Sequence, residues 1–401
     1  MTNRMRGLPT AILLALVLGL WPGAAGTIPV FARKYGFQCT MCHSHFPRLN
    51  DFGWRFRANG YQLPGRETEE RTVIQVGAPF AARVTAGYVR DQFRNTPDAE
   101  EVNEFRVESV DLLSGGLIRR NIGYLLVYPP QIEASRGVAG QTGTVEMANV
   151  VFANLGSKWL NVRAGRFEPS FSAFSDKRRL TFSPFEAFDF TFPGGPALSD
   201  TRSGVELYGY QWNDTRYYAG LVNGGQTENA DDSPSDLYVR ASHVCGRGEG
   251  QTSGYELGVT GYFGRARPEA VPDLGRKHFT RLAADASLNL PVGWNLGLQW
   301  VHGSDDADLW GAASDVSWNA GFAQVLYGPS DDWVTFARYG FVNAPTAAGG
   351  DITRWTVGGR YYPAYNLALH LEFSERRQDE VTVGTGRPRE HYFTTSLDWA
   401  F

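Results

Sequence analysis

From about residue 72 to its end, this 401-residue chain alternates polar and apolar residues in a long series of short segments. In "YNLALHLEF", Leu367, Leu369 and Leu371 share one face, while Ala368 and His370 share the other. A period of two residues is that of a β-strand with one apolar face. The segments predict 16 strands, which begin near residues 72, 104, 117, 144, 158, 204, 215, 235, 254, 277, 293, 315, 332, 352, 365 and 390.

The connections between these strands also alternate in length. Longer polar loops separate tight turns, which are predicted at residues 114–116, 156–157, 213–214, 291–293 and 329–331. The last strand alternates Leu397, Trp399 and Phe401, which is typical of the closing strand of an outer-membrane barrel. A secreted β-sandwich also alternates, but such folds rarely need so many strands. We therefore expect residues 72–401 to form an all-β, 16-stranded antiparallel transmembrane β-barrel with a polar, porin-like interior.

The first 26 residues have the features of a secretory signal peptide. Arg4 and Arg6 precede an apolar run over residues 8–20, and small residues follow Pro22. A run of about 13 apolar residues is too short for a bilayer that needs roughly 20. No later run approaches that length, so membrane insertion would require β-strands. The net charge of -4 and the lack of a basic cluster interleaved with aromatics argue against a nucleic-acid partner.

Two of the three cysteines lie close together near the start of the expected mature chain. Cys39 and Cys42 are followed at once by His43, which is the spacing of c-type haem attachment. The two thiols would form thioethers with the vinyl groups, and the adjacent imidazole would reach the iron. A thioredoxin-like redox pair would need a βαβ unit, and a zinc site would need a second ligand pair. The motif predicts one covalent haem c with His43 as proximal iron ligand, and it leaves Cys245 unpaired.

A short helix is predicted after the haem motif, because Pro47 suits a first turn and Asn59 with its following glycine suits a last one. Its apolar face consists of Leu49, Phe52 and Phe56. The monohaem cytochrome c segment, residues 27–65, is too short to bury a haem and a core unaided. Since a barrel of about 16 strands leaves a lumen, we expect that lumen to hold the segment and complete the haem pocket.

Further haem contacts are assigned by charge and by strand parity. Arg48 and Arg55, with Arg57 on the same helix, are candidates for pairing with the haem propionates, and solvated helix charges are the alternative. The distal iron ligand is expected from the barrel. His370 is the first candidate because it points inward on its strand, and Met147 is the second.

The connection over residues 167–203 is too long to be a passive turn. It holds eight phenylalanines, with Lys177, Arg178 and Arg179 between them. We expect this connection to fold into the barrel, where it constricts the lumen or covers the haem. An extracellular cover is the alternative.

The segment "PVFARKYGFQCTMCHSHFPRLNDFGWRFRANGY", followed by a barrel, resembles the fused monohaem cytochrome and porin proteins of bacterial outer membranes. That family includes the iron-oxidising outer-membrane cytochromes. The resemblance implies haem attachment at Cys39 and Cys42, with His43 as the proximal ligand. It implies electron flow from an extracellular reductant to a periplasmic c-type cytochrome or similar carrier. Its specific motifs lie between Phe31 and Tyr61, while the organisation covers the whole expected mature chain.

Electron transfer across the outer membrane is the first function that these features predict, with Fe(II) as the expected reductant and Fe(II) oxidation as the corresponding activity. Acidic segments at residues 98–104, 231–232 and 305–308 could attract a hard cation through oxygen ligands. The alternative is a diffusion porin whose haem segment is a plug or a sensor. A periplasmic cytochrome with a soluble β-domain is a third interpretation. Ser-His-Asp arrangements and phosphate-binding glycine loops are not visible, which argues against a hydrolytic enzyme.

Overall fold

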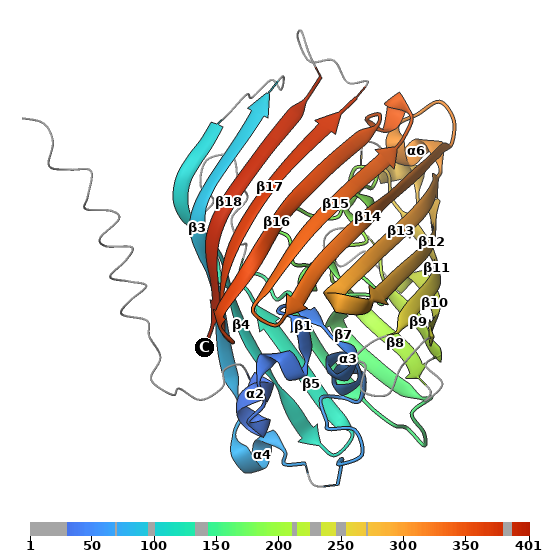
Figure 1. Cartoon of the computed structure of the whole chain (residues 1–401). Coiled ribbons are helices and arrows are strands. Elements are labelled where there is room, and N and C mark those ends of the chain that lie inside the picture. Colours follow the sequence, from blue (N-terminus) through green and yellow to red (C-terminus); the bar gives the residue numbers. More distant parts are fainter. Residues whose placement is uncertain are drawn as a thin grey trace, which may run out of the picture.

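The fold is a closed antiparallel barrel of 16 strands with a small helical segment at one end (Figure 1). The computed structural model describes residues 30–68, 70–94, 101–132, 143–210, 215–224, 234–245, 254–269, 272–379 and 387–401, so the expected signal peptide lies outside the described residues. The barrel strands are β3 (Phe80–Arg94), β4 (Glu101–Arg119), β5 (Ile122–Tyr128), β6 (Met147–Phe152), β7 (Asn161–Phe167), β8 (Arg202–Tyr210), β9 (Thr215–Asn223), β10 (Pro234–Cys245), β11 (Tyr255–Ala266), β12 (Lys277–Leu290), β13 (Trp294–Asp305), β14 (Val316–Ser330), β15 (Trp333–Asn343), β16 (Ile352–Ala364), β17 (Leu367–Gln378) and β18 (Arg389–Ala400). The predicted all-β class and strand number are confirmed.

The barrel closes where its last strand pairs with its first. β18 pairs with β3 over its length, with Trp399 opposite Val84, and each remaining strand pairs with its neighbours in sequence. Closure matters in lipid, because a free sheet edge would leave backbone N–H and C=O groups without partners. The predicted closing strand is therefore confirmed.

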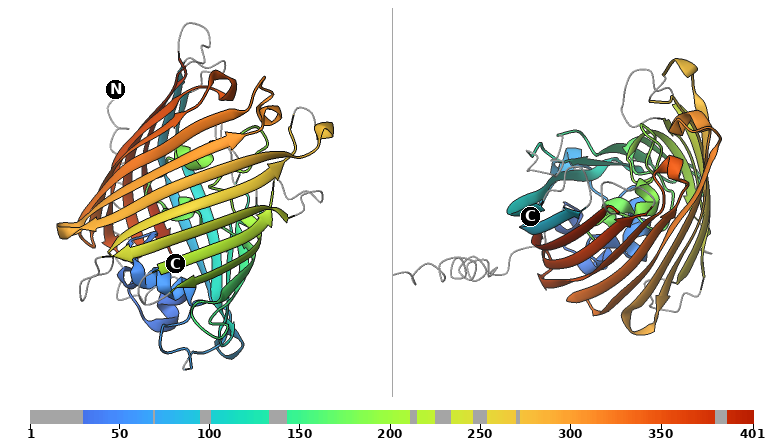
Figure 2. Two further views of the ribbon diagram at one scale, coloured as in Figure 1. Left: turned by 90° about the vertical axis from the view of Figure 1, so that its right-hand side faces the viewer. Right: turned by 90° about the horizontal axis from the view of Figure 1, so that it is seen from above.

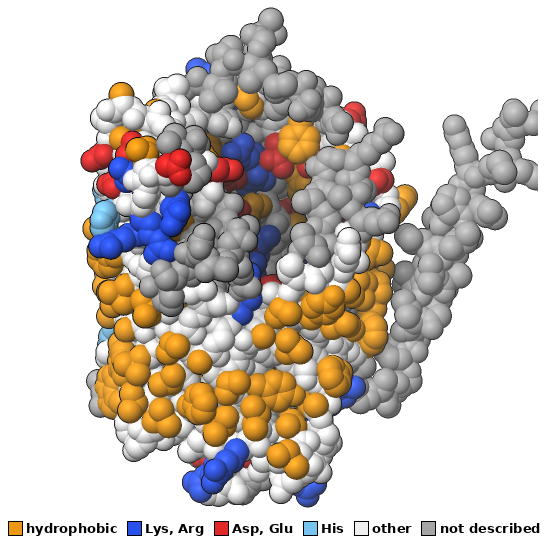
Figure 3. Space-filling view, turned by 180° about the vertical axis from the view of Figure 1, so that it is seen from behind, with side chains coloured by type: hydrophobic (Ala, Val, Ile, Leu, Met, Phe, Trp, Pro, Cys, Tyr) orange, Lys and Arg blue, Asp and Glu red, His pale blue; other side chains and the backbone are white. Residues whose placement is uncertain are grey.

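The outer surface of the barrel is apolar and the inner surface is polar. On β17, Leu369 and Leu371 are 42% and 53% exposed, whereas His370 and Glu372 are 2% and 0% exposed. Figure 3 shows a broad belt of apolar side chains across one side of the barrel, with charged side chains gathered mainly at the rim above it. This distribution is that of an outer-membrane barrel, and it confirms the predicted alternation.

At the end of the barrel where the chain terminates, four of the described connections are short turns and one, residues 153–160, is longer, whereas the described connections at the other end are all long. Residues 120–121, 291–293, 331–332 and 365–366 make short turns, while residues 168–201, 306–315 and 344–351 make longer ones. Three local predictions are wrong. Residues 156–157, predicted as a tight turn, lie within the longer connection 153–160 between β6 and β7. Residues 114–116, predicted as a turn, lie inside β4, and the first strand begins at Phe80 because Val73–Val76 form the short helix α4. The turn predicted at residues 213–214 lies outside the described residues.

Because the number of strands is even, β3 begins and β18 ends at the same end of the barrel (Figure 1). We predict that this end faces the periplasm, since short turns mark the periplasmic side of such barrels. A tag inserted at Gly349, in the connection between β15 and β16, should bind antibody on intact cells. A tag at Gly328, near the turn between β14 and β15, should bind antibody only after the outer membrane is opened. The reverse pattern would contradict this orientation.

The head segment, residues 30–65, precedes the barrel and contains five short elements: α2 (Val30–Tyr35), η1 (Cys39–Met41), β1 (His43–His45), β2 (Arg48–Leu49) and α3 (Asp51–Ala58). Helix α3 begins where the side chain of Asn50 accepts a hydrogen bond from the backbone N–H of Gly53, at 2.9 Å. The predicted helix is confirmed in its second half, but it starts later than Pro47 because β1 pairs with β2. Among the described residues, no helix is long and apolar enough to cross a membrane.

The head segment is held against the inside of the barrel wall by hydrogen bonds from wall side chains. Tyr208 on β8 donates to the carbonyl of Ala58 at 2.8 Å, and Tyr362 on β16 donates to that of Phe46 at 2.7 Å. Figure 2 shows the head segment in blue within the ring of strands when the barrel is seen along its axis. The segment therefore sits in the lumen at the end where the chain terminates.

The connection between β7 and β8 folds into the lumen, as predicted, and carries η2 (Asp176–Arg178) and α5 (Glu186–Asp189). Its central part is fixed to the opposite wall. Glu372 on β17 accepts hydrogen bonds from the backbone N–H groups of Phe182 and Ser183, at 2.7 and 2.8 Å, and Arg338 on β15 donates to the carbonyl of Ser183 at 2.7 Å. Figure 2 shows this green segment within the barrel. We call residues 168–201 the lumen loop.

Candidate functional site

Cys39, Cys42 and His43 line a single cavity between the head segment and the barrel wall. The wall side of this cavity comes from strands β3 to β6 and includes Val127 and Met147. Its empty space measures about 1480 Å³, with the open solvent at its mouth included. We call this space the cysteine cavity.

Aromatic rings of the head segment form the apolar side of the cysteine cavity. The ring of Phe31 packs edge-on against Phe56, with centroids 5.0 Å apart, and stacks on Tyr61 at 5.1 Å. A Cβ atom at Gly115 on β4 would lie 2.7 Å from the Phe31 ring, so glycine permits the wall to approach the ring closely. The surroundings therefore suit a flat, apolar ligand.

Both cysteines of the motif are free, and their surroundings keep the thiols protonated. Burial raises the pKa of Cys42 to about 11 and also raises that of Cys39. Zinc ligands and redox-active pairs need a thiolate, which burial disfavours here. Within the described ranges, no three His, Cys, Asp or Glu side chains are grouped so that they could hold a metal ion. Protonated thiols argue against a redox-active pair, which needs a thiolate as nucleophile.

The imidazole of His43 is oriented by the head segment itself. Its Nδ1 lies 3.1 Å from the carbonyl oxygen of Pro47, to which it donates a hydrogen bond, so Nε2 keeps its lone pair. Burial lowers the pKa of His43 to about 4, which keeps the ring neutral at physiological pH. A neutral imidazole whose second nitrogen donates to a backbone carbonyl is the usual state of a histidine ligand. The nitrogen of His43 that would bind a metal is therefore Nε2.

Cations lie at the polar edge of the cysteine cavity. Arg83 on β3 forms a two-pronged ion pair with Asp398, and Arg178 of the lumen loop pairs with Glu168 at 2.8 Å. Arg57 on α3 also lines the cavity, and in the described part of the chain its guanidinium has neither an ion pair nor a hydrogen bond. Arg57 is thus the cation best able to pair with a carboxylate of a bound group.

The two arginines that the sequence favoured for the propionates lie outside this cavity. Arg55 pairs with Asp51 at 2.9 Å, four residues earlier on α3, and Arg48 lines a second, polar cavity. Arg57, which the sequence offered as a further candidate, does line the cavity.

The cysteine cavity fits a c-type haem in four respects: two adjacent thiols, an imidazole with a free nitrogen, apolar rings on its sides and cations at one edge. Cys39 and Cys42 would hold the group covalently and His43 would bind its iron. Arg57, with Lys177 and Arg178 from the lumen loop, would face its carboxylates. The sequence contains no sign that these loop cations reach this cavity; the inward folding of the lumen loop brings Lys177 and Arg178 to it.

The two candidates for the distal ligand lie in different parts of the lumen. Met147 on β6 is 6% exposed and lines the cysteine cavity. His370 on β17 does not line it; its Nε2 lies 3.1 Å from a carboxylate oxygen of Glu372, and its ring packs edge-on against Phe182 at 4.5 Å. His370 therefore helps to hold the lumen loop, and the arrangement favours Met147 over His370 as the distal ligand.

Replacing Met147 by alanine should change the haem spectrum. A thioether ligand raises a haem potential, so its loss should lower the potential by a sizeable part of the roughly 0.8 V that axial ligands span. Absorption spectra in the Soret and near-infrared regions, with a redox titration, would measure both effects. His370→Ala is the matched control and should leave the spectrum unchanged. An altered spectrum in the control and none in Met147→Ala would reverse the assignment.

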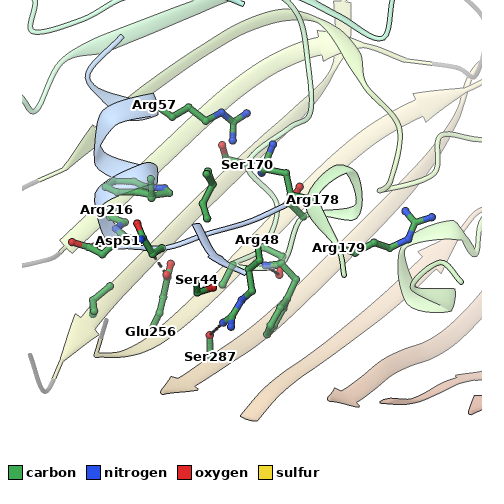
Figure 4. A pocket seen from close by; sticks show the side chains of 18 of the residues that line it. Ser44, Arg48, Asp51, Arg57, Ser170, Arg178, Arg179, Arg216, Glu256 and Ser287 are labelled. Atoms are coloured by element: carbon green, nitrogen blue, oxygen red, sulfur yellow. Dashed lines mark hydrogen bonds and ion pairs between the residues drawn. The ribbon is translucent and has the colours of Figure 1, made fainter. Parts of the chain in front are cut away.

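A second cavity lies on the other side of α3, between the head segment, the lumen loop and strands β9 to β12 and β14, and it is polar (Figure 4). Its empty space measures about 1350 Å³, with open solvent included. Arg57 and Arg178 line both cavities and so stand between them. The other cations of this polar cavity are Arg48, Arg179, Arg216 and Arg240.

The acidic segment at residues 305–308 does not present free carboxylates to a cation. Asp305 forms an ion pair with Arg281, and Asp308 pairs with Lys277. Asp306 accepts a hydrogen bond from the backbone N–H of His278 at 2.7 Å. Residues 98–100 and 231–232 of the other acidic segments lie outside the described residues. The described carboxylates of residues 305–308 therefore give no support to a cation site.

Comparisons with known proteins identify the class of fold. The chain is similar to the anion-selective porin from Comamonas acidovorans, with 11% identity over 81% of this chain and 100% of that chain, and a TM-score of 0.60. It is similar to the outer membrane channel DcaP of Acinetobacter baumannii, with 11% identity over 82% of this chain and 98% of that chain, and a TM-score of 0.58. It is also similar to Salmonella typhi OmpF, solved in complex with daunomycin, with 10% identity over 81% of this chain and 97% of that chain, and a TM-score of 0.57.

These likenesses show a barrel of the outer-membrane porin type. No protein-family model matches the chain, and no curated protein matches it. At 11% sequence identity, the likeness defines the architecture only, so the function has to be inferred from the side chains of the lumen.

Proposed function

We propose that this protein transfers electrons across the bacterial outer membrane by means of one c-type haem bound in its lumen. The haem, when bound, supplies the one-electron chemistry. The chain supplies two thiols for attachment, the Nε2 atom of His43 for the iron, and a wall that separates the group from lipid. Electrons would pass from an extracellular reductant to a periplasmic c-type cytochrome or similar carrier.

The single observation that carries this proposal is the cysteine cavity. The thiols and imidazole of the motif open onto one apolar space, whose opposite wall includes the side chain of Met147. The apolar belt of a barrel, about 25 Å tall, is an insulator that charge crosses only with a cofactor inside it. Placing a haem segment in a lumen supplies such a cofactor.

Fe(II) is the proposed reductant, and this part rests on the resemblance of the head segment to iron-oxidising outer-membrane cytochromes. The acidic segment at residues 305–308 adds nothing to it, because its carboxylates are engaged. An Fe(II) oxidase activity would consist of single-electron removal from each ion, with the electron leaving through the haem to the periplasmic carrier.

The test uses the full-length protein in liposomes that enclose an oxidised cytochrome c. Fe(II) added outside should reduce the haem first and the enclosed cytochrome second, both followed by absorption. An oxidised haem at a pH where Fe(II) can reduce it would reject iron as the donor. A reduced haem beside an unchanged enclosed cytochrome would reject transfer across the membrane.

The second candidate function is solute diffusion, with the head segment as a plug or sensor. Two observations favour it: the structural likeness to porins and the polar cavity beside α3. Single-channel recording in planar bilayers separates the two functions. An electron carrier should be nearly closed to ions with its haem in place, whereas a porin should conduct freely.

A further inference from the structure

The arginines of the polar cavity are not equally supplied with carboxylates. Asp51 and Glu256 both pair with Arg216, at 3.3 and 3.0 Å, while Glu168 pairs with Arg178 at 2.8 Å. These three are the carboxylates among the lining residues. Of two further arginines of the cavity, Arg240 pairs with Asp285 and also with Glu256 at 3.5 Å, and Arg179 pairs with Asp176. Every carboxylate at the cavity is therefore already engaged.

Arg48 is left without a carboxylate in the part of the chain that the structure describes. Its one hydrogen bond runs to the hydroxyl of Ser287 on β12, at 3.4 Å. Burial lowers the pKa of Arg48 to about 10, which still leaves the guanidinium charged at neutral pH. A guanidinium offers five N–H donors, so most of those on Arg48 remain available.

A buried hydroxyl without a partner within the described ranges lies beside this arginine. Ser44 Oγ is buried, and no hydrogen-bond partner for it exists among the described residues. Figure 4 shows Ser44, Arg48 and Ser287 together at one side of the polar cavity, with the bond from Arg48 to Ser287 drawn. Buried polar atoms without partners are uncommon, and they mark places where a ligand or water completes the hydrogen bonding.

We propose that Ser44, Arg48 and Ser287 form a binding site for a small oxyanion that enters the lumen, of the carboxylate, sulfate or phosphate class. An oxyanion would accept charge-assisted hydrogen bonds from the Arg48 guanidinium and a bond from the Ser44 hydroxyl. It would also neutralise the charge of Arg48, which faces only this cavity and has no carboxylate partner among the described residues. A cation is disfavoured here, because the free groups are donors and the nearby carboxylates are engaged.

This site is separate from the carboxylates of a bound haem. Arg57 and Arg178 line both cavities and can meet a group in the cysteine cavity, whereas Arg48, Ser44 and Ser287 line the polar cavity alone. The oxyanion site therefore does not depend on the proposed electron transfer, and it would exist equally in a diffusion porin.

The test is isothermal titration of inorganic phosphate into the detergent-solubilised, full-length protein at low ionic strength. Arg48→Gln should weaken binding about tenfold or more, since a charge-assisted hydrogen bond is lost. Ser44→Ala should weaken it by a smaller factor without disturbing the fold, because the hydroxyl has no partner to lose. Arg90→Gln is the matched control; it removes the same charge from an arginine that pairs with Glu101 near the barrel rim, and it should leave the affinity unchanged.

The site is rejected if the unaltered protein does not bind phosphate, or if Arg48→Gln and Ser44→Ala both bind it with unchanged affinity. A further arm uses the double variant Cys39→Ala with Cys42→Ala, which lacks attached haem. If phosphate binds to this variant but not to the haem-loaded protein, the anion occupies the haem carboxylate positions at Arg57 and Arg178, and the proposal fails. Equal affinity in both forms supports a distinct site.

Discussion

Replacing Cys39 and Cys42 together by alanine should abolish covalent haem, from one group per chain to none. Both thiols open onto the cysteine cavity, and the chain has one further cysteine, Cys245, which is exposed at the end of β10. A pyridine haemochrome assay on the denatured, acid-extracted protein would measure the haem that remains attached. The effect should be complete, because a thioether needs a sulfur beside the vinyl group.

Cys245→Ala is the matched control and should keep one haem per chain. The barrel should fold in all these variants, since the cysteines of the head segment pair with no barrel residue, and heat-modifiable migration on gels would report this. Haem that stays covalently attached to the double variant would contradict the proposed site, and so would its loss from the control. If the protein carries no haem even when it is exported together with a working haem-attachment system, the electron-transfer proposal is rejected and the porin function is favoured.

The strands of this chain were predictable from its sequence, because side chains alternate between the two faces of a strand and lipid requires the outer face to be apolar. Leu369 and Leu371 face lipid, while His370 and Glu372 face the lumen, as the alternation predicts. The error at residues 114–116 has a physical cause. A Cβ atom at Gly115 would lie 2.7 Å from the Phe31 ring, and one at Gly116 would lie 2.7 Å from Val73, so these glycines serve the close approach of neighbouring segments. In the sequence, a pair of glycines needed for close packing cannot be told from a pair of glycines that forms a turn.

The choice between distal ligands could not be made from parity. Parity places Met147 and His370 on the inner face, but it does not say which part of the wall the head segment contacts. That contact depends on barrel closure and on hydrogen bonds such as the one from Tyr208 to Ala58, which join residues far apart in the chain. By contrast, the ion pair between Arg55 and Asp51 was predictable from the sequence, because Asp51 lies four residues before Arg55 on the same helix.

The inward folding of the lumen loop was predictable from its length, but its anchors were not. Glu372 sits on the inner face of β17, and its sequence neighbours give no sign that it receives backbone N–H groups from Phe182 and Ser183. A carboxylate that satisfies two backbone donors far away in sequence is recognised only in the folded barrel. Removing the Glu372 carboxylate should therefore have a large effect on both the stability and the conductance of the barrel.

Replacing Glu372 by alanine should release the lumen loop and open the barrel. The carboxylate is 0% exposed and accepts hydrogen bonds from two backbone N–H groups, from the Ser183 hydroxyl and from His370. Each buried donor left without a partner costs about 1–3 kcal/mol. We expect the free energy of unfolding to fall by about 3 kcal/mol or more. Since a 16-stranded barrel without its inner loop has an aqueous lumen, the ion conductance should rise at the same time.

Glu375→Ala provides the matched control for this variant, because it makes the same substitution three residues further along β17. Glu375 pairs with Arg377, whose side chain is about half exposed, and ion pairs in contact with solvent contribute about 0–1 kcal/mol. Thermal unfolding in detergent and single-channel recording would measure both variants. If Glu372→Ala loses stability without any rise in conductance, the lumen loop blocks the barrel independently of this anchor. If neither property changes, the loop is held by its other contacts, such as those of Arg338 and Arg360, and the carboxylate is not the anchor that its hydrogen bonds indicate.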